Sequence, residues 1–262
     1  GYKNVILVVG GDRVKEFDKQ IRPYINHSDP KKSYNFENFE AALRRVNIEG
    51  PDAVILDIGI SSDQLEGPSR GFSFDQEGPL DMRMNPRTES KAQDLINALS
   101  KEELADLFWK YGEERRARQY AEAVVRKRPF QTTTELAEAI MDTLPPNMKR
   151  YFGPNVTSRP PWLRRHPATK IFQALRIAVN DELGVLERAL PKLWQALKPG
   201  GRMAVISFHS LEDRIVKNYF RELKQQKVGT LLTKKPIAPS REEVKENSRA
   251  RSAKLRVIEK AS

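Results

Sequence analysis

Residues 54–84 read VILDIGISSDQLEGPSRGFSFDQEGPLDMRM, and this stretch decides the fold class. The apolar run from Val54 to Leu56 predicts a buried strand of a parallel sheet, and this strand stops at Asp57. Open α/β sheets bind their ligands just beyond the carboxyl ends of the strands, so a carboxylate here is a candidate site residue.

The segment after this strand has the features of a functional loop. Gly59, Ser61 and Ser62 are small and allow a substrate to approach the backbone closely. Two turn-prone runs follow, residues 71–74 and 77–84. A long loop with this much Gly, Pro and paired charge is more often functional than filler. The alternative is a surface loop beside an ordinary strand.

Strands and helices alternate on both sides of this stretch, which predicts a parallel sheet. The helix that starts near residue 170 could continue to residue 197. The predicted elements are strands over residues 5–9, 53–58 and 203–207, helices over 14–24, 35–46, 170–190 and 210–225, and an antiparallel edge pair of 228–237 with 255–259.

Residues 88–165 have a helical hydrophobic period, which predicts a helical insertion into the α/β domain. Ser100 followed by Glu103 predicts a capping box at the start of one helix. The predicted helices cover residues 92–99, 101–111, 114–126 and 134–144, and residues 147–165 are expected to be irregular. The α/β core then consists of residues 1–87 and 166–262.

The charge of the chain points to a phosphate-rich partner. Its 262 residues include 46 Lys and Arg against 35 Asp and Glu, a net charge of +11. A merely basic soluble or organellar protein is the alternative, but most of the basic clusters fall in one region, roughly residues 110–166. The candidate nucleic-acid contacts are Arg115, Arg116, Arg118, Arg164, Arg165, Arg249 and Arg251.

Several classes of protein are disfavoured by composition. The absence of cysteine removes disulfides, thiolate catalysis and cysteine-bound zinc, and three scattered histidines predict no metal site. No apolar run approaches the ~18 residues of a membrane span, so no membrane partner is expected. The sequence has no signal-peptide pattern, the chain is basic, and its start does not look like a native N-terminus. We therefore expect the protein to be located in the mitochondrial matrix, with a bacterial cytoplasm as the alternative location.

The stretch 57–84 also resembles the signature of the RsmH (MraW) family, the small-subunit rRNA cytosine-N4 methyltransferases that use S-adenosylmethionine. The resemblance covers nearly all of the chain from Phe39 onward, in order. The further matching blocks are YGEER (111–115), HPAT (166–169) with FQALR (172–176), PGGR (199–202) leading into SFHSLEDR (207–214), and NSRAR (247–251) with LR (255–256).

This resemblance implies a Rossmann-like class I methyltransferase core with an inserted helical domain for RNA recognition. It implies S-adenosyl-L-methionine as the cofactor, small-subunit rRNA as the substrate, and ribosomal or assembly proteins as partners. The implied cofactor contacts are Asp12, Phe39, Asp57 and Gln64. Asp12 could instead be a turn residue, and Phe39 a core aromatic on an amphipathic helix.

The candidate catalytic residues are Asp57, Ser61, Ser62 and His209. An acceptor such as Asp57 or a serine hydroxyl could hold the exocyclic amine of cytosine in position for attack. His209 follows the strand over 203–207, and a substrate contact or a structural histidine is equally compatible with its position.

Aromatic residues are candidates for stacking on unpaired bases. A target base must leave its stack to reach the pocket, and Phe72, Phe74 and the loop methionines could receive it or could simply fold the loop on itself. Within the helical region Trp109, Trp162, Tyr151 and Phe152 could stack on bases, although helical spacing predicts that Trp109 belongs to the core.

Members of the family carry a first strand and a Gly-rich cofactor loop ahead of the segment that starts here, and this sequence has no counterpart of either. Two hypotheses follow. Either upstream residues are missing from the sequence and the protein is an ordinary methyltransferase, or it is an inactive RNA-binding factor in assembly of the small ribosomal subunit. The intact segment 57–84 favours the enzyme.

Overall fold

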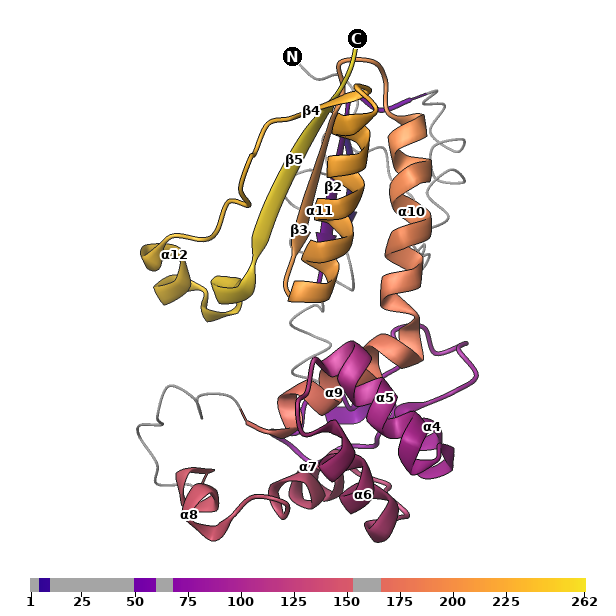
Figure 1. Ribbon diagram of the computed structural model, residues 1–262, viewed down its shortest axis with the longest axis vertical. Helices are drawn as coiled ribbons and strands as arrows, with labels where there is room; N and C mark the ends of the chain where they lie inside the picture. Colours follow the sequence, from indigo (N-terminus) through magenta and orange to yellow (C-terminus); the bar gives the residue numbers. More distant parts are fainter. Residues whose placement is uncertain (1–4, 10–49, 60–67, 153–165) are drawn as a thin grey trace. The chain divides into compact units, whose positions relative to one another are not determined.

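The computed structural model describes residues 5–9, 50–59, 68–152 and 166–262 (Figure 1). The chain forms two compact units, residues 1–62 with 183–262, and residues 63–182. The helices predicted over residues 14–24 and 35–46 lie outside the described residues.

The first unit is built on a five-stranded sheet of order β1-β2-β3-β5-β4. Strands β1, β2 and β3 are parallel, whereas β5 runs antiparallel to β3 and β4, so the predicted parallel core and antiparallel edge are confirmed. The strands are β1 (Val5–Val9), β2 (Ala53–Ile58), β3 (Arg202–Ser207), β4 (Gly229–Leu231) and β5 (Lys254–Lys260). The other elements are α10 (Glu182–Ala196), which begins at the last residue of the second unit, α11 (Ser210–Gln225), α12 (Arg241–Glu246) and the 3-10 helix η5 (Ser248–Ser252).

Helices α10 and α11 cover one face of this sheet (Figure 1). Side chains alternate between the two faces of a strand, and in β2 Val54, Leu56 and Ile58 are the buried set. They pack with Met203 and Val205 of β3 against the apolar stripes of the two helices. Burying these aliphatic side chains supplies most of the stability of the unit.

Lys260 connects the end of β5 to the end of α10 through hydrogen bonds. Its ammonium group donates to the carbonyls of Trp194 (2.9 Å), Gln195 (3.1 Å) and Leu197 (2.6 Å). These carbonyls have no partner within the helix, and a cation there also complements the helix dipole. Partial burial lowers the pKa of Lys260 below its usual value of 10.5.

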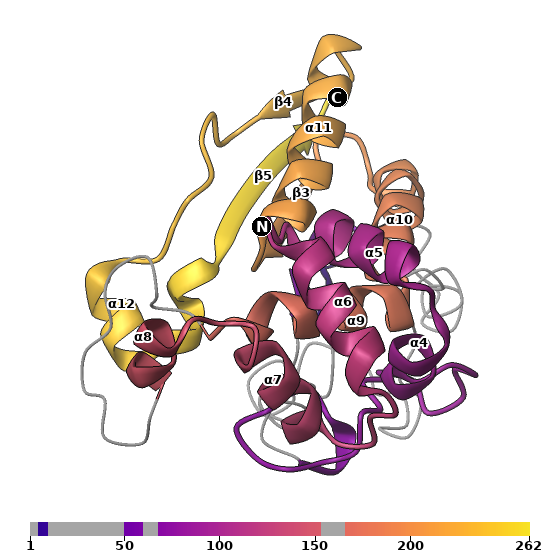
Figure 2. The same ribbon diagram turned by 60° about the horizontal axis from the view of Figure 1, so that its bottom comes forward.

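The second unit is helical, and it extends beyond the predicted limits of 88 and 165 at both ends. Helix α9 packs against α4, α5 and α7, and α6 packs against α5 (Figure 2). The elements are η2 (Pro68–Arg70), α4 (Ala92–Ala98), α5 (Lys101–Gly112), α6 (Ala117–Lys127), α7 (Thr133–Met141), α8 (Pro146–Lys149), η3 (Arg150–Phe152) and α9 (Ala168–Asn180).

The predicted helices of this unit are confirmed to within three residues at each end, including the capping box at the start of α5. Ser100 accepts the N–H of Glu103 (3.2 Å), and the Glu103 carboxylate accepts the N–H of Ser100 (2.8 Å). The box satisfies two backbone groups that the helix leaves unpaired.

Three predictions in this region are wrong. The start of the stretch over 147–165, which was expected to be irregular, forms α8 and η3. The single helix predicted over 170–190 is interrupted at Asp181, whose left-handed backbone (φ 47°) separates α9 from α10. Trp109 is 61% exposed rather than part of the core. It lies beside the buried stripe of α5, which consists of Leu104, Ala105, Phe108 and Gly112.

Within the described residues, no helix combines the length and the apolar character required to cross a bilayer.

Candidate active site

The parallel strands of the first unit end together at one edge of the sheet. Val9 at the end of β1 pairs with Asp57 of β2, and Asp57 pairs with Ile206 of β3. The carboxyl ends of three parallel strands therefore meet at the level of this carboxylate. This is the edge where open α/β sheets bind their ligands.

Asp57 is half-buried and lies on the face of β2 opposite to that covered by α10 and α11. The alternation of the strand settles this, because Leu56 and Ile58 point into the packed core between sheet and helices. The carboxylate is therefore not part of the hydrophobic core, although it is next to it in sequence. A half-buried carboxylate at this edge can accept hydrogen bonds from a ligand and balance a positive charge on it.

The backbone just beyond Asp57 is in close contact with an aromatic ring. A Cβ atom built on Gly59 would lie 2.8 Å from Cε2 and 3.1 Å from Cδ2 of Phe208. Real Cβ atoms do not approach carbon this closely, so only glycine fits here while the ring keeps its position. Phe208 directly follows β3, and the ends of β2 and β3 are thus in van der Waals contact.

A buried carboxylate holds the turn that follows β3. Glu212, in the first turn of α11, accepts the N–H of Phe208 (2.9 Å) and of His209 (3.2 Å). Its residue is 2% exposed. His209 is the N-cap of α11, and its Nδ1 accepts the N–H of Glu212 (3.4 Å). This reciprocal pair is a capping box in which histidine replaces the usual Ser or Thr.

His209 has a structural role through one of its ring nitrogens. Nδ1 serves the cap, whereas Nε2 is buried 3.1 Å from Oε1 of Glu212 and makes no hydrogen bond within the described residues. This is the structural role that sequence left open beside a substrate contact. The catalytic role of His209 stays a prediction.

Asp213 joins the same turn of α11 to β5. Its carboxylate is paired with Arg256 (2.7 Å) and Lys254 (3.2 Å). Burial raises the pKa of Asp213, but the hydrogen bonds from Arg256 and Lys254 lower it by more, so the net pKa lies below 3.8. Glu212 and Asp213 together therefore anchor α11 to the strand ends.

In the second unit, the motif over residues 70–84 is a tightly folded element. Gly71 has φ +67°, and a Cβ there would lie 2.0 Å from the carbonyl oxygen of Pro79. Arg70 donates to the carbonyls of Arg83 (2.9 Å) and Met84 (2.8 Å). The chain thus folds back on itself in a way that no residue except glycine permits at position 71.

The apolar side chains of this motif fold the loop. Phe72 is 6% exposed and Met82 is fully buried, so neither presents a surface for stacking on a base. Phe74 is half-buried and packs on His166 (4.6 Å between ring centroids) and on Phe172 (4.9 Å). Phe74 is therefore the one ring of this motif, within the described residues, that retains exposed surface.

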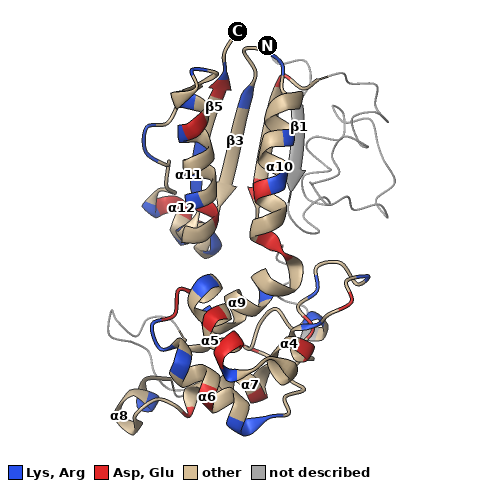
Figure 3. Ribbon diagram, turned by 45° about the vertical axis from the view of Figure 1, so that its right-hand side comes forward, with Lys and Arg blue, Asp and Glu red and all other residues tan. Residues whose placement is uncertain are grey.

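The candidate RNA contacts that the structure describes are exposed. Arg115, Arg116 and Arg118 lie around the first turn of α6, and Arg249 and Arg251 lie in η5 of the first unit. Three arginines at a helix N-terminus oppose the helix dipole, so this placement does not serve helix stability. Acidic and basic residues are interspersed over both units (Figure 3).

The remaining predicted site residues lie outside the described residues. These are Asp12, Phe39, Ser61, Ser62, Gln64, Arg164 and Arg165. Trp162 lies outside as well. Their assigned roles stay predictions.

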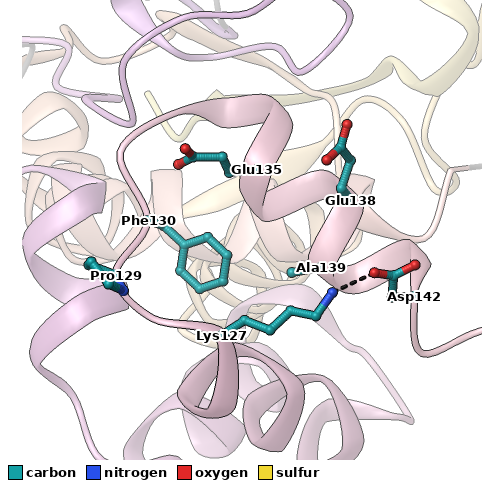
Figure 4. Close-up of a pocket in the computed structure, with 7 residues that line it drawn as sticks. All are labelled: Lys127, Pro129, Phe130, Glu135, Glu138, Ala139 and Asp142. Atoms are coloured by element: carbon teal, nitrogen blue, oxygen red, sulfur yellow. Dashed lines mark hydrogen bonds and ion pairs between the residues drawn. The ribbon is translucent and has the colours of Figure 1, made fainter.

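A shallow pocket of about 340 Å3 lies in the helical unit between the end of α6 and α7 (Figure 4). Three of its charged residues, Lys127, Glu135 and Asp142, already have partners in the same unit. Lys127 is paired with Asp142, and Glu135 accepts the N–H groups of Gln131 (2.7 Å) and Thr132 (3.0 Å). We therefore assign no part of a reaction to this pocket.

The sheet order, the strand-end carboxylate and the added helical unit define an α/β protein of the Rossmann-like methyltransferase class. Residues 12–261 match the model of the MraW methylase family. Because this match covers almost the whole chain, the chain belongs to that family.

Similar proteins carry the name ribosomal RNA small subunit methyltransferase H. The one from Carboxydothermus hydrogenoformans is 42% identical over 269 residues, covering 96% of this chain and 82% of the relative. The one from Rippkaea orientalis is 54% identical over 207 residues, covering 79% and 63%. The one from Halothermothrix orenii is 40% identical over 274 residues, covering 97% and 84%. The chain therefore spans 63–84% of the length of these relatives.

Sequence reasoning missed the contacts that fix the strand ends. Glu212, Asp213 and the Gly59–Phe208 contact were not singled out. The spacing of His209 and Glu212 is that of a capping box and could have identified Glu212. Nothing in the sequence indicates that the Phe208 ring covers Gly59, because that contact depends on the register between β2 and β3.

Proposed function

We propose that this protein is an S-adenosylmethionine-dependent methyltransferase that modifies N4 of a cytidine in small-subunit ribosomal RNA. The observation that carries this proposal is the family match over residues 12–261, combined with a carboxylate at the carboxyl edge of the sheet. The names of the similar proteins support the same substrate class.

The residues at this edge fit the cofactor. Asp57 offers a half-buried carboxylate to a ligand that carries a sulfonium, an ammonium and ribose hydroxyls. When bound, S-adenosylmethionine supplies an already activated methyl group, so acid–base chemistry by the protein is a minor requirement. Asp12, Phe39 and Gln64 are proposed to complete the cofactor site.

The main task of the protein is then to position the acceptor. The lone pair of the cytosine exocyclic amine is delocalised into the ring, and this makes the amine a poor nucleophile. Asp57, or the hydroxyl of Ser61 or Ser62, would accept a hydrogen bond from the amine and orient its lone pair toward the methyl group. The base leaves its stack to reach this edge.

The helical unit is proposed to hold the RNA backbone. Arg115, Arg116 and Arg118 are exposed and would contact phosphates, which position the substrate without specifying its sequence. Arg164, Arg165, Arg249 and Arg251 are proposed to extend this contact, and Phe74 is a candidate for stacking on a base.

The direct test is methyl transfer to small ribosomal subunits that lack the modification. We expect label from S-adenosyl-[methyl-3H]methionine in the rRNA, and N4-methylcytidine in its nuclease digest by mass spectrometry. Asp57→Asn should lower the rate at saturating RNA by about 100-fold, the usual loss when a transition-state hydrogen bond is removed. An unchanged rate would remove Asp57 from the mechanism.

The alternative function is that of a catalytically inactive RNA-binding factor in small-subunit assembly. Calorimetry separates the two functions. Heat of binding with S-adenosylmethionine supports the enzyme, whereas salt-dependent rRNA binding without cofactor binding or label transfer supports the assembly factor.

We also propose the mitochondrial matrix as the location, with a bacterial cytoplasm as the alternative. Imaging of the tagged full-length protein in its own cells tests this.

A further inference from the structure

We propose that Phe208 is a positioning residue for methyl transfer. Glu212 holds the backbone of Phe208, and the Phe208 ring lies against Gly59 and thereby fixes the position of Asp57. This inference rests on the proposed function, because the reaction it serves is the transfer described above.

The first step is the contact between the ring and the glycine. Three carbons of the Phe208 ring lie 2.8, 3.1 and 3.5 Å from the position that a Cβ on Gly59 would occupy. The ring therefore lies directly against the Gly59 backbone. Gly59 is two residues beyond Asp57, so a shift of the ring would be transmitted to the strand end over a very short stretch of chain.

The second step is that the backbone carrying this ring is held in place. Glu212 accepts the N–H of His209, as a capping box requires, but it also accepts the N–H of Phe208 at 2.9 Å. This second bond is not needed to cap the helix. Its effect is to fix the backbone of the residue whose side chain covers Gly59.

The third step is the choice of histidine as the N-cap. Ser, Thr, Asp and Asn are the preferred N-cap residues, and any of them could accept the N–H of Glu212. Histidine adds a ring nitrogen 3.1 Å from the other carboxylate oxygen of Glu212, whose side chain is 3% exposed. The two atoms are in contact without a hydrogen bond, so the ring packs against the buried carboxylate and limits its movement.

The consequence is a rigid link from α11 to the end of β2. Glu212 fixes Phe208, Phe208 covers Gly59, and Gly59 follows the carboxylate proposed to orient the acceptor. Misplacement of a reacting group by about 1 Å can cost about 100-fold in rate. A methyl group at position 59 or loss of the ring at position 208 should therefore reduce turnover while leaving the sheet intact.

The test is a double-mutant cycle in the full chain with Gly59→Ala, Phe208→Leu and the double variant. We expect each single variant to lower kcat for methyl transfer by about 10- to 100-fold, with a smaller change in KM for S-adenosylmethionine. The double variant should be no slower than Phe208→Leu alone, because the added methyl group no longer meets a ring. Additive losses would overturn the proposal.

Gly229→Ala is the matched control for a purely structural effect. A Cβ at Gly229 would lie 2.9 Å from Ile258 and 3.0 Å from Trp194, at the opposite edge of the same sheet. We expect it to lower the melting temperature about as much as Gly59→Ala but to leave kcat within about twofold of the unaltered chain. An equal loss of kcat in both variants would mean that only stability is measured.

Failure of the proposed function gives a different result. If the unaltered chain transfers no methyl group to rRNA, the proposed function fails and the positioning role fails with it. If the unaltered chain is active and the losses at positions 59 and 208 are additive, only the positioning role is overturned.

Discussion

The side-chain amide of Asn180 donates a hydrogen bond of 2.8 Å to the carbonyl of Met82, a residue 98 positions earlier in the chain. Its oxygen accepts the N–H of Met84 at 2.7 Å, so one side chain satisfies two backbone groups of the same turn. Met82 has a left-handed backbone (φ 60°) and is fully buried. Asn180 thus supports a strained turn from the end of α9.

Asn180→Ala should destabilise the helical unit. Removal of both bonds leaves buried backbone groups of the turn without partners, which costs about 1–3 kcal/mol. Urea unfolding measures the loss, and hydrogen exchange at the Met84 amide should accelerate. The control is Gln119→Ala, whose exposed side chain makes one bond to the carbonyl of Thr143 and should change stability by less than about 0.5 kcal/mol. Equal stability of the two variants would contradict this role for Asn180.

A comparison of Gly71 with Gly200 can separate the cost of a left-handed backbone conformation from the cost of a steric clash. Both have positive φ, +67° and +72°, but only Gly71 is crowded, since the nearest atom to a Cβ at Gly200 is 3.8 Å away. Gly200→Ala should cost about 1–2 kcal/mol from the left-handed conformation alone. Gly71→Ala adds a clash with the Pro79 carbonyl and should cost clearly more. Similar losses in chemical denaturation would show that the loop relaxes around the clash.

The sequence predicts the sheet because its strands are short apolar runs with turns at both ends. Val54 to Leu56 shows this pattern, and the observed strand has the predicted limits. The break at Asp181 was not predictable, since neither Gly nor Pro marks it and the apolar spacing continues through it. The exposure of Trp109 was not predictable either. The spacing of apolar residues defines the faces of a helix but does not tell which face another helix covers.

Some residues of the candidate site could likewise be predicted from the sequence, and others could not. Asp57 could be singled out because the end of an apolar strand is a local signal. The role of Phe208 could not be, because it depends on a contact with Gly59, about 150 residues away in sequence. Glu212 is identifiable only as a capping residue, from its spacing to His209. For Phe72 the sequence left open whether the ring stacks on a base or folds the loop. Its burial follows from the way the loop closes over Gly71.

Asp213 should make stability depend on pH. Its folded-state pKa is lowered, so its contribution is fully present above the unfolded value of about 3.9 and is lost as pH falls through the lower folded value. Asp213→Asn should lower stability by about 2 kcal/mol at pH 7. The gap to the unaltered chain should shrink in urea titrations below about pH 4. A gap that stays constant down to acid pH would contradict the assignment.

Asp142→Asn provides the contrast. Hydrogen bonds from Lys127 and Lys149 lower the pKa of Asp142 to about 2, but its side chain is 53% exposed. Solvent screens such pairs, so despite the low pKa we expect a loss of at most about 1 kcal/mol at pH 7. A larger loss than that of Asp213→Asn would show that burial does not determine the strength of these pairs.

The arginines around the start of α6 should determine how RNA binding responds to salt. If Arg115, Arg116 and Arg118 contact phosphates, replacing all three by Ala should weaken rRNA binding about equally for different sequences. The slope of log K against log salt should fall by about 2–3, roughly one for each phosphate contact that is lost. The charge-matched control replaces Lys217, Arg221 and Lys224, which are exposed on α11 of the other unit. An equal change of slope in both triple variants would mean that net charge, rather than a binding surface on the helical unit, attracts the RNA.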